Sequence, residues 1–535
     1  MHIPLKNCFF KNTLSATLLL LSFCGKAQAP SLLITNSYNE QQVVYNNDTT
    51  LHTAWKPLLY IDTSATRGTG SWFHRKFFQE HLLQLKQKDF NLNADIIFDE
   101  YIGYSKRPIK PVPINGVTKD PSNVPMMNTR GYEISGNISD KFYFETAFYE
   151  NQGRFGGYID SFIRAYRIIP GQGAYKNTGD GLGFDFSISE AKLMYQPSKH
   201  FLFDLGYGKN FIGDGYRSML LSDWAFNYPY FKTSINLGKL QYSFMWSQYI
   251  SDRDPALQND QEQFRKWAQT FLIDWKATKH LSLSLFETVM WPDQDSSRRS
   301  DRSPWIASPI IFLHGSKSPS GVSNSTIVGT NIKYQVFKRT HVYAQFAADQ
   351  LGDISSWETR YAMQLGIRSG NLFNVNNLNG LLEFNTARPY MYATNSLNTN
   401  YAQLKQSLAN PHGGNFKEGL LLVDYRIKNW YFRFETFVTK YGADSLPPSS
   451  TNYGSDIFKP ISTHTVSSDV KTGQGVATNK FYADMRIAYI LNPATNMRIE
   501  AGFTYRDEKS DLFTYKDRIF YIGIRMSFRK ISYDF

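Results

Sequence analysis

The sequence contains very little cysteine: among its 535 residues only Cys8 and Cys24 are cysteines. Both lie within the first 24 residues. If these residues are removed on export, the rest of the chain has no cysteine, which excludes disulfide bonds and thiol catalysis there. The chain also lacks any apolar run of the roughly 20 residues that a transmembrane helix needs, which excludes a helical membrane protein. Aromatic residues make up 16%, too many for extensive disorder. These absences leave a membrane β-barrel possible, because its apolar residues alternate along each strand.

The first 27 residues have the pattern of a secretory signal peptide. Basic residues precede an apolar stretch from Leu14 to Phe23, and small residues follow it up to Ala29. The apolar stretch is too short to span a membrane, so we expect cleavage after Ala27 and export. Cys24 leaves a lipoprotein as the alternative, which the bulky Phe23 before it disfavours.

Positive charge exceeds negative charge, with 58 Lys and Arg against 46 Asp and Glu and a net charge of +12. Nucleic acid is not an expected partner of an exported chain. A mild positive excess instead fits anionic outer-membrane lipid or an acidic surface polysaccharide.

Residues 28–90 differ in pattern from the rest of the chain and are expected to form an N-terminal periplasmic arm and helix. Residues 28–70 show no strong periodicity. Over 71–88 apolar residues such as Phe73 and Phe77 recur three to five positions apart, which predicts a helix with Ser71 as its N-cap. Such a helix either packs on a neighbouring surface or serves as a periplasmic plug or docking helix.

From residue 91 to 535 the pattern has a period of two. Ile499, Ala501 and Phe503, for example, alternate with Glu500 and Gly502. Successive strand side chains face opposite ways, so each strand has one apolar and one polar face. These strands are about ten residues long, the length of a tilted membrane crossing, whereas ordinary strands average about five or six. Short connections such as 338–339 also alternate with long ones such as 292–324.

These features predict an all-β fold, a transmembrane antiparallel outer-membrane β-barrel with about 18 strands and a short N-terminal helical segment. The expected strands lie near 92–104, 131–138, 141–150, 183–195, 200–209, 231–237, 240–250, 267–277, 280–291, 326–337, 340–350, 357–368, 379–388, 417–427, 430–441, 480–491, 496–506 and 517–529. The chain ends in Tyr533-Asp534-Phe535, and a terminal Phe with an aromatic residue two positions earlier resembles the assembly signal of outer-membrane proteins.

The polar faces of the later strands carry charges of both signs. Because neighbouring strands hold opposite charges, these side chains can pair with one another, which favours a crowded, partly closed lumen over an open water channel. The charged residues expected to face inward are Asp424, Arg426, Arg433, Glu435, Asp484, Arg486, Arg498, Glu500 and Arg525.

No catalytic pattern is present. The sequence has neither a Gly-x-Ser-x-Gly elbow nor a His-Glu-x-x-His metal motif. His341 could in principle act as the base of a barrel hydrolase, but a packed strand histidine is the simpler interpretation. Asp252, Asp254 and Asp260 could bind calcium, but solvated charges are the simpler interpretation. We therefore expect no enzyme activity, no catalytic residues, no cofactor and no metal.

The long loops are rich in aromatic residues, including Trp224, Tyr228, Tyr390 and Tyr392. These rings could form an interfacial belt and pack the loops over the barrel mouth. Alternatively, they could stack on sugar faces while nearby Asn, Asp and Arg side chains bond hydroxyl or carboxylate groups.

One loop carries a distinctive segment from Gly206 to Pro229, GYGKNFIGDGYRSMLLSDWAFNYP. It resembles the glycine-rich segment and the following Leu-Ser-Asn/Asp-x-Ala run of the Wzi family of capsule-assembly proteins. This resemblance implies an 18-stranded outer-membrane barrel with N-terminal helices that holds capsular polysaccharide at the cell surface. The Trp-Gly-Pro usual in the family corresponds to Ile212-Gly213-Asp214 here.

A second segment from Gln406 to Glu418, QSLANPHGGNFKE, is similar to the branch of that family found in gliding Bacteroidota, the RemB-like proteins. Asn410 stands where a histidine is expected in that branch. The resemblance implies a possible role in gliding motility.

The sequence therefore predicts an outer-membrane barrel that binds or organises surface polysaccharide, with a porin-like solute channel or a structural partner of a motility or secretion complex as alternatives. The residues expected to contact polysaccharide are Asn210, Asp214, Arg217, Asp223, Trp224, Tyr228, Tyr390, Tyr392, His412 and Asn415.

Overall fold

The fold is taken from a computed structural model of the chain. It describes residues 31–34, 51–62, 68–106, 112–114, 117–119, 123–251, 265–293, 308–313, 324–445 and 451–535. The candidate calcium residues Asp252, Asp254 and Asp260 lie outside these residues.

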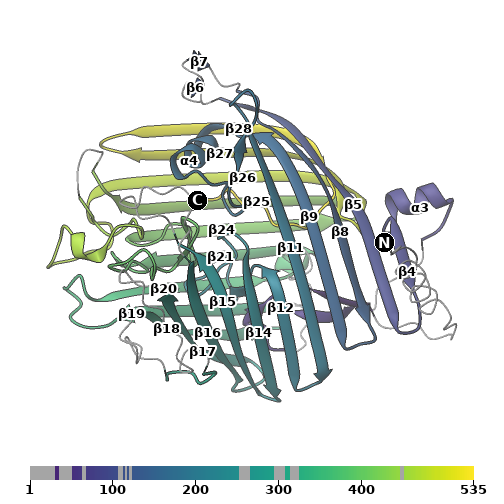
Figure 1. Cartoon of the computed structure of the whole chain (residues 1–535), viewed down its shortest axis with the longest axis horizontal. Helices are drawn as coiled ribbons and strands as arrows, with labels where there is room; N and C mark the ends of the chain where they lie inside the picture. The colour runs from purple at the N-terminus through teal and green to yellow at the C-terminus, as the bar shows by residue number, and fades with distance from the viewer. Residues whose placement is uncertain are drawn as a thin grey trace, which may run out of the picture.

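A closed antiparallel β-barrel forms most of the molecule (Figure 1). Each strand pairs with its neighbour in sequence, and the last strand pairs with the first. The 18 strands of the wall confirm the predicted fold and strand number. They are β5 (Phe90–Ser105), β8 (Met126–Ile138), β9 (Phe142–Arg154), β11 (Phe184–Ser198), β12 (Phe201–Gly208), β14 (Tyr228–Leu237), β15 (Leu240–Ile250), β16 (Arg265–Lys276), β17 (Leu281–Pro292), β18 (Ser325–Phe337), β19 (Thr340–Gln350), β20 (Arg360–Ser369), β21 (Leu378–Ala387), β24 (Phe416–Ile427), β25 (Trp430–Ala443), β26 (Val476–Asn492), β27 (Met497–Ser510) and β28 (Thr514–Arg525).

Short strands accompany the wall. They are β1 (Ser31–Ile34), β2 (Trp55–Lys56), β3 (Leu59–Asp62), β4 (Leu83–Lys86), β6 (Val112–Ile114), β7 (Val117–Lys119), β10 (Lys176–Asn177), β13 (Phe211–Ile212), β22 (Ala402–Gln403) and β23 (Gln406–Ser407). Among the described residues, no helix has the length and apolar character needed to cross a membrane.

The alternation of side chains along the wall sorts them by polarity. On β27, Ile499 is exposed on the outer face while Glu500 is buried on the inner face. Glu500 accepts a hydrogen bond from Arg498 at 2.8 Å and lies 3.4 Å from Arg525, and Asp484 pairs with Arg486 at 2.6 Å. The inward charges thus satisfy one another, as expected for a crowded lumen.

The barrel closes at a short seam, where the last wall strand, β28, pairs with the first, β5. β28 pairs with β5 only over residues 100–105 of β5. Part of the remaining edge of β5 is paired by β4, whose residues 83–86 lie opposite residues 91–94. Covering this edge removes unpaired backbone groups that would otherwise invite aggregation.

The N-terminal helix is shorter than the predicted one over 71–88. Helix α3 (Trp72–Phe78) begins at the predicted N-cap, where the Ser71 hydroxyl accepts a hydrogen bond from the His74 amide, but it ends at Phe78. Residues 83–86 form β4 because the open edge of β5 offers backbone hydrogen bonds that outweigh the local helical pattern. A second helix, α4 (Gly157–Tyr166), lies in the loop after β9 and was not predicted.

The C-terminal residues leave the wall, contrary to the predicted last strand over 517–529, whereas the role of Tyr533-Asp534-Phe535 as an assembly signal stays a prediction. β28 ends at Arg525, and residues 526–535, the C-terminal tail, run into the barrel interior (Figure 1). Asp99 on β5 accepts hydrogen bonds from the Met526 amide at 2.6 Å and from the Ser527 hydroxyl at 3.1 Å, which turns the chain inward. The Phe535 ring packs on Phe162 of α4 with centroids 4.5 Å apart, so it belongs to the core rather than to a strand end.

Candidate functional site

The loop between β12 and β14 enters the lumen instead of staying above it. We call residues 209–224 the inner loop. Its strand β13 pairs with β2 of the N-terminal arm, Phe211 opposite Lys56 and Ile212 opposite Trp55. Both tryptophan and isoleucine are almost completely buried. A glycine-rich loop and an arm with no periodicity therefore meet inside the barrel.

Inward side chains from the wall strands β19 and β21 hold the inner loop by its backbone. Gln345 on β19 accepts a hydrogen bond from the Met219 amide at 2.8 Å and donates one to the Ile212 carbonyl at 3.1 Å. Glu383 on β21 accepts hydrogen bonds from the Tyr216 and Arg217 amides at 2.8 and 3.1 Å. These contacts satisfy backbone groups that burial would otherwise leave without partners.

Arg217 is buried and has two carboxylate partners. Its Nε is 3.2 Å from the Glu418 carboxylate on β24, and its Nη1 is 2.8 Å from the Asp534 carboxylate on the tail. The Tyr216 hydroxyl also donates a hydrogen bond to Asp534 at 2.8 Å. A buried guanidinium with two carboxylate partners is well compensated, and truncating it would leave both acids without their charge partner.

Asp214 forms a second buried pair. Its carboxylate is 3.1 Å from Lys333 Nζ and accepts a hydrogen bond from the Asn331 amide at 2.9 Å. Burial alone would raise the pKa of Asp214, but the positive charges of Lys333 and Lys56 outweigh it and lower the pKa below its ordinary value. Asp214 is therefore a charged anchor of the inner loop.

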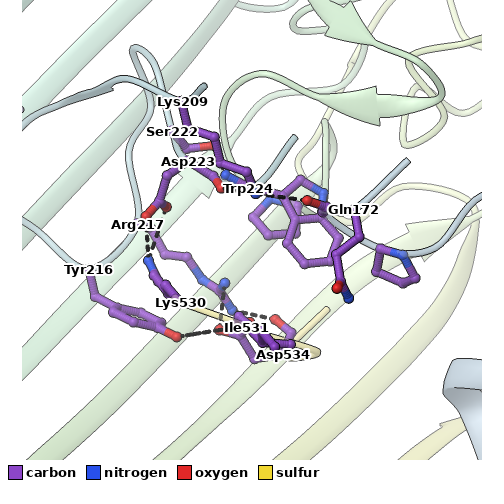
Figure 2. Close-up of a pocket in the computed structure, with 14 residues that line it drawn as sticks. Gln172, Lys209, Tyr216, Arg217, Ser222, Asp223, Trp224, Lys530, Ile531 and Asp534 are labelled. Carbon is purple, nitrogen blue, oxygen red and sulfur yellow. Dashed lines mark hydrogen bonds and ion pairs between the residues drawn. The ribbon is translucent and has the colours of Figure 1, made fainter. Parts of the chain in front are cut away.

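A pocket lies where the inner loop, the loop after α4 and the C-terminal tail meet (Figure 2). Its basic groups are Lys209, Arg217 and Lys530, and its acidic groups are Asp223 and Asp534. The other lining residues are Pro170, Gly171, Gln172, Tyr216, Ser222, Trp224, Pro411, Ile531 and Ser532.

The two lysines of the pocket differ in environment. Lys209 Nζ donates hydrogen bonds to the Gly171 carbonyl at 2.9 Å and to the Asp223 carbonyl at 3.1 Å. Burial lowers the pKa of Lys209 to about 8, against the raising effect of the Asp223 carboxylate. Lys530 Nζ lies 2.9 Å from the Asp223 carboxylate, and about a third of each of these two side chains is exposed. The Lys530–Asp223 pair is thus the accessible part of the pocket.

The structure brings only some of the predicted contact residues together. Arg217, Asp223 and Trp224 line the pocket. The buried ones are Asn210, Asp214, Arg217, Trp224, Tyr228, Tyr390, Tyr392 and Asn415. Their role in polysaccharide binding stays a prediction.

Several predicted residues outside the pocket bond other parts of the protein. Asn210 Oδ1 accepts a hydrogen bond from the Trp55 indole at 3.0 Å, and the Tyr228 hydroxyl accepts one from the Asn210 amide at 3.2 Å. Tyr392 donates to the Met219 carbonyl at 2.7 Å. The aromatic loop from residue 389 onward therefore packs on the inner loop.

His412 and Asn415 close the same loop against the wall. His412 Nε2 lies 3.2 Å from the Glu418 carboxylate. Asn415, in the left-handed region with a φ of 58°, donates hydrogen bonds to the Gly442, Tyr453 and Gln474 carbonyls. These contacts position the two residues within the loop layer.

Sequence reasoning missed Lys209, Lys530 and Gln172. Lys209 stands within the distinctive segment, so its proximity to that motif was an available signal. Lys530 and Gln172 lie in segments without periodicity, and only the inward turn of the tail places Lys530 here.

A metal centre is not apparent in the described part of the chain, where no three His, Cys, Asp or Glu side chains are grouped to hold an ion.

Comparison of sequences gave no matching family model and no significant match among curated proteins. Comparison of structures gave clear matches. The chain is similar to Wzi of Escherichia coli, described as a carbohydrate-binding outer-membrane β-barrel involved in group 1 capsule assembly: 13% of residues are identical, 93% of this chain and 99% of that chain are covered, and the TM-score is 0.51.

Two other solved structures overlap less well. OprD, an outer-membrane protein of Pseudomonas aeruginosa, shares 9% identity over 84% of this chain and 97% of its own, with a TM-score of 0.42. OccAB2 of Acinetobacter baumannii shares 10% identity over 81% of this chain and 97% of its own, with a TM-score of 0.40. At these identities the likeness to Wzi establishes the fold, a Wzi-like barrel of the outer-membrane type.

Proposed function

We propose that this protein is an outer-membrane barrel that binds or organises surface polysaccharide, with its pocket as a contact site for acidic sugars. The Wzi-like fold supports the placement in the outer membrane, and the alternation of long loops and short turns supports an orientation with the long loops outside the cell. The signal peptide over 1–27 is part of this proposal.

The observation that carries the proposal is the pocket itself. It combines three basic side chains with two acidic ones, the Gln172 amide and the Trp224 ring, at the end of the barrel where the long loops lie. The enclosed space is only about 30 Å³, so a sugar would meet the pocket at its exposed pair of side chains. There a uronic acid offers a carboxylate to Lys530 and hydroxyl groups to Asp223. Charge-assisted hydrogen bonds of this kind favour an acidic glycan over a neutral one.

Within the predicted contact set, the structure favours two roles. Asp223, partly exposed beside Lys530, is suited to meet a sugar directly. The buried residues, among them Arg217 and Asp214, are suited to hold the inner loop in place. We propose this division and keep all ten residues as part of the site.

The porin-like alternative predicts an open path through the lumen. The inner loop, the C-terminal tail and the arm residues 51–58 all contribute buried side chains to the interior, which disfavours such a path. Planar-bilayer recording separates the two functions: we expect no steady conductance, and steady single-channel currents would establish the porin.

A supporting role in gliding motility, as in the RemB-like branch of Bacteroidota, and contact with motility or secretion proteins remain further parts of the proposal. They rest on the segment from Gln406 to Glu418. That segment contacts the inner loop, since the Ser222 amide donates a hydrogen bond to the Leu408 carbonyl at 2.7 Å.

The proposal is tested in a strain that lacks the gene, by measuring polysaccharide retained on cells against polysaccharide shed into the medium. We expect more shed polysaccharide, restored by the wild-type gene but only in part by the double variant Asp223→Ala/Lys530→Ala. The matched control is Lys279→Ala, at an exposed turn on the opposite end. An unchanged ratio of retained to shed polysaccharide would contradict the proposal, and lost colony spreading with that ratio unchanged would favour a motility scaffold.

A further inference from the structure

Helix α3 has an unusual surface for a helix attached to a folded domain. All seven of its residues are partly or fully exposed, including Trp72 at 53%, Phe73 at 79% and Phe77 at 58%. Phe73 and Phe77 are four positions apart and therefore share one face of the helix. A contiguous aromatic face of this kind, left open to the surroundings, marks an interaction surface.

The contacts that hold α3 on the barrel are polar and lie at its C-terminal end. Asn492 at the end of β26 donates hydrogen bonds to the Lys76 and Glu80 carbonyls at 3.2 and 3.0 Å. The Glu80 carboxylate in turn lies 3.0 Å from Lys76 Nζ. The helix is thus fixed without using its aromatic face, which excludes a plug that would bury these rings in the lumen.

The aromatic face of α3 continues the outer surface of the wall. Figure 1 shows α3 beside β4, at the edge of the barrel. β4 extends β5 with Leu83 opposite Ala94 and Leu85 opposite Leu92, so the exposed leucines join the outer face that Ile96 and Phe98 also form. In an outer-membrane barrel this face contacts lipid.

A ring of exposed aromatics surrounds the same end of the barrel. At the short turns, exposed rings include Trp275, Phe337 and Trp430. Trp430 packs edge-on against Tyr489 with centroids 5.1 Å apart, on strands β25 and β26, and α3 is tied to β26 at Asn492. Aromatic girdles of this kind lie at the level of lipid headgroups.

We infer that α3 is an interfacial helix that inserts Trp72, Phe73 and Phe77 into the membrane leaflet at the short-turn end and continues the aromatic girdle across the seam beside β5. Its partner is phospholipid at the boundary between headgroups and acyl chains. The helix would shield the part of the β5 edge that β28 does not pair. It would also anchor the N-terminal arm, which enters the lumen. This inference rests on the membrane placement in the proposed function but not on polysaccharide binding.

The low cysteine content makes a direct test possible. In a Cys8→Ser/Cys24→Ser background, single cysteines at Phe73→Cys and Phe77→Cys carry a fluorescent bimane group in the full-length protein, reconstituted in phosphatidylethanolamine and phosphatidylglycerol vesicles. Quenching by lipids brominated on their acyl chains reports lipid contact, and quenching by iodide reports water. Leu285→Cys on the outer wall and Lys279→Cys in an exposed turn are the controls.

We expect bromolipid quenching at 73 and 77 to be at least half of that at 285, with iodide quenching several-fold weaker than at 279. Labels at 73 and 77 that behave like the label at 279 would overturn the inference, because the helix would then face water or a protein partner. Weak bromolipid quenching at 285 itself would overturn the membrane placement and the inference with it. Because the two phenylalanines bury no core surface, heat-modifiable gel mobility of the variants should match that of the parent.

Discussion

Arg217 and Asp534 form an ion pair inside the barrel, with Nη1 and Oδ2 2.8 Å apart and both side chains buried. The first residue belongs to a loop that follows β12, and the second is next to the last residue of the chain. Glu418 on β24 completes the group at 3.2 Å from Arg217. Loop, tail and wall are therefore held together at one point, so the contents of the lumen form one packed unit.

Replacing Arg217 with Ala should strongly destabilise the protein. The change leaves Glu418 and Asp534 buried without their cation, a situation that costs about 3–5 kcal/mol in the free energy of unfolding. The measurement is urea unfolding of the refolded barrel in detergent. Lys516→Ala is the control, because Lys516 is exposed and its pair with the partly exposed Asp507 should contribute less than about 1 kcal/mol. Equal losses in the two variants would contradict the central role of Arg217.

Gly213 should tolerate no side chain. Its φ of 140° is rarely adopted by other residues, and an added Cβ would lie 2.2 Å from Gln345 Nε2. Gly213→Ala should therefore cost about 1–3 kcal/mol through backbone strain and the loss of the Gln345 contacts. Gly208→Ala is the matched control, since no heavy atom lies within 4 Å of its Cβ. A stable Gly213→Ala protein in the same urea titration would show that the inner loop is not held as described.

The wall of the barrel could be predicted from the sequence because its signal is local. The alternation of Ile499 and Glu500 needs no knowledge of distant residues, since a strand places them on opposite faces. The contents of the lumen have no such signal. Trp55, Arg217 and Phe535 lie in segments without periodicity, and their positions depend on wall side chains far away in the sequence. Residues 83–86 also depend on another part of the chain, because they form a strand by pairing with the open edge of β5 instead of continuing the helix.

The sequence predicted which kinds of residue form the candidate site better than it predicted where their side chains lie. The polar and aromatic residues of the loops were recognised, but the sequence cannot distinguish a side chain that faces solvent from one that holds a loop. Asp214 and Tyr392 bond buried partners, whereas Asp223 reaches the pocket. Lys530 was missed because it follows the predicted strand over 517–529 in a segment without periodicity, and no local pattern shows that the tail turns into the lumen.

His412 should make the loop layer sensitive to acid. Burial, together with the positive charge of Lys480, lowers the pKa of His412 to about 4, against the raising effect of Glu418. Because the folded pKa lies below the unfolded value of about 6.5, the folded state binds fewer protons between these values. The contribution of this group to the free energy of unfolding is therefore greatest above pH 6.5, and it falls by up to about 3 kcal/mol as the pH drops toward 4.

The urea midpoint of His412→Asn measured at pH 7 and pH 4.5 tests this expectation. The variant should lose less stability on acidification than the wild type, and the difference between the two isolates the histidine from other titrating groups. His280→Asn, in an exposed turn, should follow the wild type. Parallel curves for wild type and His412→Asn would contradict the prediction.

Asp534 should give the tail the opposite pH dependence. Burial, opposed by Arg217 and reinforced by Glu435, raises the pKa of Asp534 above its ordinary value. Because the cost of burying the Asp534 charge exceeds the attraction of its ion pair with Arg217, the folded state favours the protonated carboxyl group. Docking of the tail is therefore strongest at low pH and weakens as the pH rises through that pKa. The labelling rate of an Ile531→Cys thiol, relative to Lys279→Cys at each pH, should therefore increase between pH 5 and pH 8. Asp534→Asn should remove most of this increase because the amide does not titrate, and an increase of the same size in that variant would show that Asp534 does not control the tail.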